Sequence, residues 1–442
     1  MGLASILTLV VFAAPFFLSR SDGFDVLDPN GNITIKWDVM AGYGDKYDAK
    51  VWIFNYQLFR HIELPGWRLS FKWPEDEVIW NMQGAEATLQ GNCSRFTGFR
   101  PHSCEKKPVL IDLLPAAPFK LRSANCCKGG VLSTHNQNPD TYGASFELTV
   151  GVGTTSDAVP FPIPDNFTLG VPGYTCSPPF NVTPSKYSED SGRRWTQAIS
   201  TWEVTCVYSQ FRAWPTPRCC VSLSSFYDST IVPCPKCSCN CQGLPGARCV
   251  NPGETPPILQ LPHGTLQEPT PVVRCSQHMC PVRVHWHVKQ SYREYWRAKL
   301  TITNMNFAKN YTQWNIVMQH PNLQNITQVF SFNYHPLNQH GTINDTGMFW
   351  GIQFYNDMLL QSGDYGNVQT EILLNKDPKM FTFSEGWAFP RKISFNGEQC
   401  VMPSLEDYPR LPKTSATTTA ASTGDGLWIV TILVTLAIVS GL

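Results

Sequence analysis

The densest group of reactive side chains is a cysteine cluster near the middle of the chain. It begins with the adjacent pair Cys219-Cys220 and continues in a C-x2-C-x-C-x-C pattern at Cys234, Cys237, Cys239 and Cys241. Thiolates at such spacing can bind zinc, but structural zinc sites usually have C-x2-C pairs that are well separated in sequence. The sixteen cysteines form an even number, which favours disulfides in an oxidising compartment. We therefore predict no metal, and disulfides of open connectivity that hold the base of a following linker to the first domain.

Sequence motifs of the common catalytic sites are absent. The chain has no G-x-S-x-G elbow, no H-E-x-x-H pair and no P-loop. Glu75, Asp76 and Glu77 could supply glycosidase carboxylates, but three adjacent acids after a proline are more typical of a solvated loop. We predict a protein that is not an enzyme and needs no cofactor. A carbohydrate-modifying enzyme remains the alternative, because a pair of carboxylates leaves no local signature.

Composition favours two β domains and a neutral partner. A chain of 442 residues exceeds what a single hydrophobic core usually supports. Lys+Arg and Asp+Glu both total 34, and no long basic run is present to bind nucleic acid. Segments rich in β-branched and aromatic residues recur between Gly, Pro and Asn turns, without a long 3.6-residue period. The predicted class is all-β.

An internal repeat divides the chain. The segment Ile35-Lys-Trp-Asp-Val39 is echoed by Val284-His-Trp-His-Val288, and Ala49-Lys50 by Ala298-Lys299, at a constant offset of 249 residues. After a gap of two residues, Trp67 also aligns with Trp314. Such a long offset indicates a duplicated domain rather than a solenoid. We therefore predict two related antiparallel β-sandwiches joined by a Pro/Gly-rich linker over 242–271.

The repeat separates core aromatics from candidate contact aromatics. Strand residues alternate between two faces, so Val51 and Ile53 share the core face. The opposite face carries Trp52, Phe54 and Tyr56, where the second copy has Thr301, Thr303 and Met305. Outward rings that the duplicate lacks are suited to contact with sugars, with burial under a loop or the other domain as the alternative. We select Trp52 and Tyr56 as polysaccharide-binding residues, and assign Trp37, Trp67, Trp286 and Trp314 to the cores.

Four further residues are judged against the repeat. Trp73 and Trp80 have no counterpart in the second copy, and simple alternation places Trp73 on the core face together with Trp67. His285 and His287 could chelate a ligand from one strand face, but Lys36 and Asp38 occupy the equivalent positions. A structural surface role is therefore the preferred interpretation of the two histidines.

Both ends of the chain carry targeting signals. An apolar stretch over 3–18 followed by Ser21-Asp22-Gly23 predicts a signal peptide cleaved after Gly23. The apolar run over 427–442 is short, is preceded by small residues and has no basic residue after it, as in a GPI-attachment signal. The spacer length favours Ser415 or Ala416 as the ω residue, and local chemistry also suits Ser422.

Seven N-x-[ST] sequons are spread along the chain and predict N-glycans on exposed turns. They are Asn32, Asn92, Asn166, Asn181, Asn310, Asn325 and Asn344.

Several longer motifs resemble those of the plant COBRA and COBRA-like proteins. They include Asn125-Cys-Cys-Lys-Gly129, Cys219-Cys-Val-Ser222, Tyr311-Thr-Gln-Trp314 and Gly386-Trp-Ala-Phe-Pro-Arg391. The resemblance covers nearly the whole chain from Phe24 to Cys400. It implies a GPI-anchored protein of the cell surface that assists cellulose microfibril deposition, crystallinity and oriented cell expansion. It also implies a cellulose-binding-module-like N-terminal region, with contacts at positions that match Trp37, Tyr43, Trp73 and Trp80; from these we keep Trp73 and Trp80.

The predicted protein is therefore a non-catalytic, GPI-anchored binder of cellulose or another wall glucan at the outer leaflet of the plasma membrane. A cell-surface adaptor for other proteins is a further alternative. The predicted order of segments is a signal peptide (1–23), a first sandwich ending in the cysteine-rich region (24–241), the linker (242–271), a second sandwich (272–403), a stem with the ω site (404–426) and a removed tail (427–442).

Overall fold

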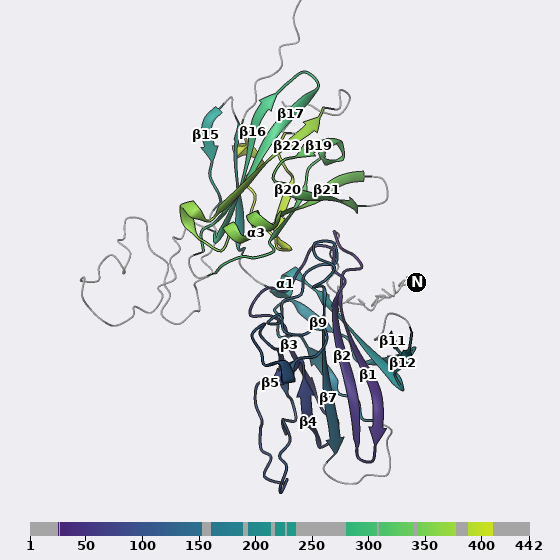
Figure 1. Cartoon of the computed structure of the whole chain (residues 1–442). Helices are drawn as coiled ribbons and strands as arrows, with labels where there is room; N and C mark the ends of the chain where they lie inside the picture. Colours follow the sequence, from purple (N-terminus) through teal and green to yellow (C-terminus); the bar gives the residue numbers. More distant parts are fainter. Residues whose placement is uncertain are drawn as a thin grey trace, which may run out of the picture. The chain divides into compact units, whose positions relative to one another are not determined.

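The computed structural model consists of two compact units (Figure 1). Unit 1 covers Met1–Pro215 and unit 2 covers Thr216–Leu442. The structure describes residues 25, 27–152, 161–188, 193–213, 217–225, 228–235, 280–306, 309–339, 343–376 and 388–409. The predicted signal peptide, linker, ω residues and apolar tail lie outside these ranges.

Unit 1 is built from two β-sheets. The larger sheet has the strand order β10-β13-β1-β2-β7-β4 with β9 beside β13, and the smaller has the order β5-β6-β3-β8. A separate two-stranded hairpin is formed by β11 and β12. The elements of this unit are β1 (Ile33–Tyr43), β2 (Lys46–Asn55), β3 (Arg68–Lys72), β4 (Glu77–Gln83), β5 (Ala85–Ala87), β6 (Val109–Asp112), η1 (Phe119–Leu121), β7 (Gly143–Val152), β8 (Asp165–Thr168), β9 (Tyr174–Cys176), β10 (Phe180–Val182), β11 (Lys186–Ser188), β12 (Trp195–Gln197), β13 (Ser200–Tyr208) and α1 (Gln210–Ala213).

Alternation along the strands makes this unit a sandwich. In β2 every second residue is buried, so one face of the strand meets the core and the other faces outward. The core unites Trp37 and Val51 of the larger sheet with Phe71 and Phe167 of the smaller one. The two sheets are therefore packed face to face around one hydrophobic core.

Unit 2 has the same two-sheet plan. Its sheets have the strand orders β15-β14-β16-β17-β22-β19 and β20-β21-β18-β23-β24. Their inward residues, such as Trp286 and Phe349, share a single core. The elements are β14 (Cys219–Ser225), β15 (Asp228–Val232), β16 (Val282–Ser291), β17 (Tyr295–Asn304), β18 (Asn315–Gln319), η2 (Leu323–Asn325), β19 (Ile326–Val329), β20 (Phe332–Gln339), β21 (Ile343–Gly351), α3 (Gln353–Met358), η3 (Gly363–Tyr365), β22 (Asn367–Asn375), β23 (Lys392–Phe395), β24 (Glu398–Gln399) and η5 (Leu405–Asp407).

The central hairpins of the two units correspond residue by residue. Trp37 pairs with Val51 across β1 and β2, and Trp286 pairs with Leu300 across β16 and β17. The register of the first hairpin shifts between Val39 and Ala41, and that of the second shifts at the equivalent step. The offset of 249 residues thus preserves the pairing, the irregularity and the buried tryptophan. This agreement supports a duplicated fold.

The last residue of each second hairpin strand is a fully buried asparagine. The Asn55 side-chain amide donates to the carbonyl oxygens of Arg60 (2.8 Å) and Ser133 (3.1 Å), and its oxygen accepts the backbone N–H of Gln57 (3.1 Å). Asn304 repeats this pattern in unit 2, with its amide donating to the carbonyl of Lys309 (2.9 Å) and its oxygen accepting the N–H of Asn306 (2.8 Å). Each asparagine fastens the loops that follow the hairpin.

The disulfides correct the predicted place of the cysteine-rich region. Cys219 is bonded to Cys400 and Cys220 to Cys234, and β14 pairs in parallel with β16. The Cys219-Cys-Val-Ser222 motif is therefore a strand of unit 2, where we expected it to end the first sandwich. Parallel pairing joins strands that are distant in the sequence, so closeness to the first domain along the chain was misleading. Three disulfides lie within unit 1, namely Cys93–Cys104, Cys126–Cys127 and Cys176–Cys206.

Replacement of either buried asparagine is expected to destabilise the fold. Asn55→Ala or Asn304→Ala should lower the free energy of unfolding by about 3 kcal/mol, because each buried group left unpaired costs about 1 to 3 kcal/mol. Urea unfolding of the secreted chain, followed by tryptophan fluorescence, measures this loss. The exposed Asn81→Ala in β4 is the control and should change the free energy by less than about 0.5 kcal/mol. Losses as small as the control's would contradict the role of the two asparagines.

Candidate functional site

Three aromatic rings follow one another along the outward side of β2, namely Trp52 and Phe54 on the strand and Tyr56 directly after its end. We call them the aromatic row. The alternate residues Val51 and Ile53 are fully buried in the core, whereas Trp52 and Phe54 are half-buried and Tyr56 is 46% exposed. The predicted alternation of faces is thus confirmed. The binding role that we assigned to Trp52 and Tyr56 stays a prediction.

The rings of the row are stacked on one another. Trp52 and Phe54 are parallel within 8° with centroids 5.4 Å apart, and Phe54 and Tyr56 have centroids 5.7 Å apart. Two rings side by side in one plane need about 6.5 Å between centroids to keep their edge atoms about 3.5 to 4 Å apart. The rings therefore overlap partly and present their edges, rather than their open faces, to solvent.

Two tyrosines from elsewhere in the chain extend the row. Tyr187 of β11 stacks on Trp52 at 5.9 Å and 13°. Tyr142, just before β7, lies 5.8 Å from Phe54 and 6.2 Å from Tyr56. Sequence reasoning missed both residues, because they are brought to β2 by tertiary structure and no local pattern marks them. The alternative that a loop covers part of the strip is also partly realised, since Tyr187 covers one side of Trp52.

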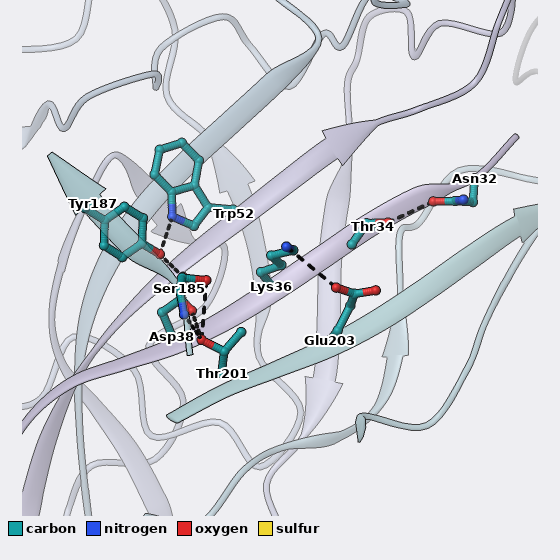
Figure 2. A network of polar contacts seen from close by, with 9 residues as sticks. All are labelled: Asn32, Thr34, Lys36, Asp38, Trp52, Ser185, Tyr187, Thr201 and Glu203. Atoms are coloured by element: carbon teal, nitrogen blue, oxygen red, sulfur yellow. Dashed lines mark hydrogen bonds and ion pairs between the residues drawn. The ribbon is translucent and has the colours of Figure 1, made fainter. Parts of the chain in front are cut away.

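A buried carboxylate fixes the orientation of Trp52 and Tyr187 (Figure 2). The Trp52 Nε1 donates to the Tyr187 hydroxyl at 3.0 Å, and that hydroxyl donates to Asp38 Oδ2. Asp38 Oδ1 accepts a second hydrogen bond from the Thr201 hydroxyl. Asp38 is fully buried, and this burial raises the pKa of its carboxyl. The chain of hydrogen bonds holds the β11–β12 hairpin against the outward face of the sheet.

Charged side chains accompany the rings along the same face. Lys50 lies 5.2 Å from the ring centroid of Trp52 and forms an ion pair with Glu147 at 3.2 Å. Lys36 and Glu203 form another pair at 3.7 Å (Figure 2). These groups can exchange hydrogen bonds with hydroxyls of a ligand that contacts the rings.

Trp80 belongs to a second aromatic group on this face. It contacts Phe96 at 5.1 Å and stacks with Phe99 at 6.3 Å, and the Lys46 ammonium lies 3.9 Å from its ring centroid. Lys46 and Trp52 have the same parity on β2, so they share a face about 20 Å apart at roughly 3.3 Å per residue. Phe99 is 75% exposed. The structure thus brings Trp52, Tyr56 and Trp80 to one face of the larger sheet.

Trp73 is a core residue, and its selection as a binding residue was wrong. Its side chain has no exposed surface and packs between Phe71 at 4.9 Å and Trp37 at 6.0 Å. Trp37, which the family resemblance also implied, is equally buried, whereas Tyr43 is 49% exposed. Alternation of strand faces, counted from Trp67, correctly predicted that Trp73 lies in the core. The binding role implied by the family resemblance predicted the wrong face for this residue.

The sequon asparagines lie mostly at the surface. Asn92, Asn166, Asn181 and Asn310 are exposed, and Asn32 and Asn325 are half-buried. The side chain of Asn344 lies outside the described residues. Exposure is necessary for a glycan but does not establish one, so N-glycosylation stays a prediction.

The remaining candidates for chemistry have structural partners. Glu77 is buried, and its carboxylate accepts the backbone N–H of Glu75 at 2.8 Å. His285 lies within 2.8 Å of both the Ser222 and the Ser224 hydroxyls. Within the described ranges, no group of three or more His, Cys, Asp or Glu side chains could hold a metal ion. In the same part of the chain, no helix is long and apolar enough to span a membrane.

Comparison with known proteins gives matches over both units. Residues 47–209 match the COBRA N-terminal domain, and residues 218–409 match the COBRA family C-terminal domain. COBRA-like protein 6 of Arabidopsis thaliana is 54% identical over 93% of this chain and 91% of its own length. COBRA-like protein 3 of Oryza sativa subsp. japonica is 55% identical over 92% of this chain and 90% of its own length. Protein COBRA of Arabidopsis thaliana is 52% identical, with coverage of 92% and 90%.

The core position of Trp73 predicts a change in stability rather than in ligand binding. Trp73→Ala should lower the free energy of unfolding by about 3 to 5 kcal/mol, the usual loss for a buried large aromatic ring. Thermal unfolding measured by circular dichroism tests this effect. Tyr56→Ala, at an exposed ring, is the control and should cost less than about 1 kcal/mol. A Trp73→Ala protein as stable as the wild type would show that the ring is not part of the core.

Proposed function

The chain belongs to the COBRA family, and on this premise we propose that it is a non-catalytic cell-surface protein that binds cellulose or a related glucan. Membership of this family supports a role at the plant cell wall in cellulose-related processes. The proposed binding surface is the outward face of the larger sheet in unit 1.

One comparison within the molecule carries this proposal. The second unit repeats the hairpin of the first, yet it has Thr301, Thr303 and Met305 in place of the aromatic row. The fold therefore does not need rings at these positions. Aromatic side chains that the fold does not require, and that reach the surface, are suited to a ligand with apolar C–H groups.

The geometry suggests how a glucan chain would lie. The edges of Trp52 and Phe54 and the exposed ring of Tyr56 offer apolar contact along β2. Lys50 and Glu147 lie beside them and can bond to sugar hydroxyls. Trp80 and Tyr56 lie at opposite ends of this face, and strand geometry separates them by more than about 20 Å. An extended chain therefore fits this face better than a single sugar ring. Assistance of microfibril deposition would follow from holding such chains near the membrane.

We also propose that the protein is attached to the outer leaflet by a GPI anchor. The support is the short apolar run over 427–442 and the small residues Ser415, Ala416 and Ser422 before it. A lipid tether would keep the aromatic face outside the membrane and leave the protein free to diffuse in the leaflet.

Cellulose binding should depend on the rings of the first sheet. The secreted chain should bind crystalline cellulose in a pull-down, and Trp52→Ala combined with Tyr56→Ala should weaken binding about tenfold, because each aromatic contact contributes about 0.5 to 1.5 kcal/mol. Trp80→Ala, tested separately, should also reduce binding. Tyr365→Ala is a matched control, since Tyr365 is 80% exposed in unit 2. Undiminished cellulose binding by both the Trp52 and Tyr56 double variant and the Trp80 variant would contradict the assignment of this face as the binding surface.

Membrane attachment should be sensitive to a GPI-specific phospholipase. Treatment of membranes from cells that express the full chain should release the protein into the soluble fraction, because cleavage removes the lipid. A control protein with a known spanning helix should remain bound. Retention of this chain after cleavage would contradict the proposed anchor.

A further inference from the structure

The outward face of the central sheet in unit 2 is cationic. Strands β16, β17 and β22 form the middle of this sheet (Figure 1). Their charged residues are Arg283, Lys289, Arg297, Lys299 and the single acid Glu371, all on the face away from the core. Four cations against one carboxylate leave a net positive charge on this face.

The one carboxylate is already occupied by two of the cations. Glu371 Oε1 pairs with the Lys289 ammonium, and Glu371 Oε2 lies 3.1 Å from Arg297. The Lys289 hydrogen bond holds the pKa of Glu371 below its usual range, so this acid stays ionised. Lys299 lies opposite Glu371 in the ladder but forms no ion pair with it in the described structure. Arg283 is exposed and also has no acidic partner among the described residues.

Two neutral histidines lie between these unpaired cations. Burial, together with the neighbouring His287, Arg283 and Lys299, lowers the pKa of His285 to about 4. Burial, with Lys299 and Lys289, also lowers the pKa of His287. Ser224 contacts His285 Nε2 and His287 Nδ1, both at 2.8 Å. Both ring nitrogens of His285 are therefore engaged by serine hydroxyls, and the two neutral rings separate cations on a face whose field favours anions.

A hollow of about 1110 Å³ adjoins this face. Arg283, His285 and Ser222 line it, and much of the remaining wall is apolar, including Ile231, Val232, Met305 and Met402. Asp407 is the acid in the lining. Apolar walls beside a guanidinium suit an organic ligand with both a carboxylate and C–H surface better than a small inorganic anion.

The equivalent face of unit 1 is balanced instead. Lys36 pairs with Glu203 and Lys50 pairs with Glu147, and Asp38 stands at the position of His287. The position of Arg283 is held by Thr34. The two copies therefore present different chemistry on the same strands, aromatic and charge-balanced in one and cationic in the other.

We propose that the outward face of β16 and β17 binds an acidic polysaccharide of the polyuronate class, whose carboxylates pair with Arg283 and Lys299. Side chains on one face of a strand repeat about every 6.6 Å, which spreads the positive charge along an extended surface as a polymer requires. Arg283 can take a carboxylate in a bidentate pair, and Lys299 acts as a point charge. This second site is independent of the glucan-binding surface proposed for unit 1.

Binding to polygalacturonate tests the proposal on the intact secreted chain. The wild-type protein should bind the immobilised polymer, bind it less as salt rises, and not bind the fully methyl-esterified polymer, which lacks the charges. Arg283→Ala combined with Lys299→Ala should weaken binding at least tenfold. Lys107→Ala combined with Lys120→Ala, at exposed lysines of unit 1, is the charge-matched control and should bind as the wild type does.

Four results would overturn the proposal. The first three are no binding of polygalacturonate by the wild type, equal losses in the double variant and its control, and equally good binding of the methyl-esterified polymer. Full competition by inorganic phosphate at equal charge concentration would also overturn it, since it would indicate a small-anion site. Cellulose pull-down of the same preparations distinguishes the two sites. The Arg283 and Lys299 double variant should bind cellulose as the wild type does, so a loss of polygalacturonate binding is separate from the result for the aromatic row.

Discussion

The register of the central hairpin in each unit determines which side chains reach solvent. Because strand residues alternate between faces, a slip of one residue between β1 and β2 would turn Val51 outward and Trp52 into the core. Pairing of Trp37 with Val51, the irregularity after Val39 and the buried Asn55 at the strand end all hold this register. The same three features recur in unit 2 around Trp286 and Asn304. The surfaces proposed for binding therefore depend on backbone pairing rather than on the loops.

A fixed core face leaves the opposite face free to diverge. In both units the inward residues of the hairpin are apolar, and they are similar between the copies. The outward residues are not, since the three rings of one copy are replaced by Thr301, Thr303 and Met305 in the other. In unit 1 the β11–β12 hairpin covers part of this face, and a buried acid holds it there. Asp38 accepts two hydroxyl hydrogen bonds, which offset the cost of placing a carboxyl beneath Tyr187.

The sequence was informative where structure depends on residues close together in the chain. Alternation within β2 correctly assigned Val51 and Trp52 to opposite faces, and the repeat identified the second copy. The sequence could not predict that Tyr187 stacks on Trp52 or that Cys219 pairs with Val282, because these contacts join distant segments and leave no local pattern. The prediction that Trp73 binds a polysaccharide was wrong for another reason. It transferred a family role to a residue whose side chain is buried in the core.

The stacked arrangement of the row has a consequence for how a glucan can be held. Rings that cover one another's faces have less apolar area left for a ligand, so each contact is weaker than on an open ring. Tyr56, at the end of the stack, keeps the largest exposed fraction of the row. Firm attachment then requires several weak contacts along one chain, and an extended polymer supplies them where a single sugar cannot. A second surface of opposite character on the same chain would allow neutral and acidic polymers to be held together without competition for one site.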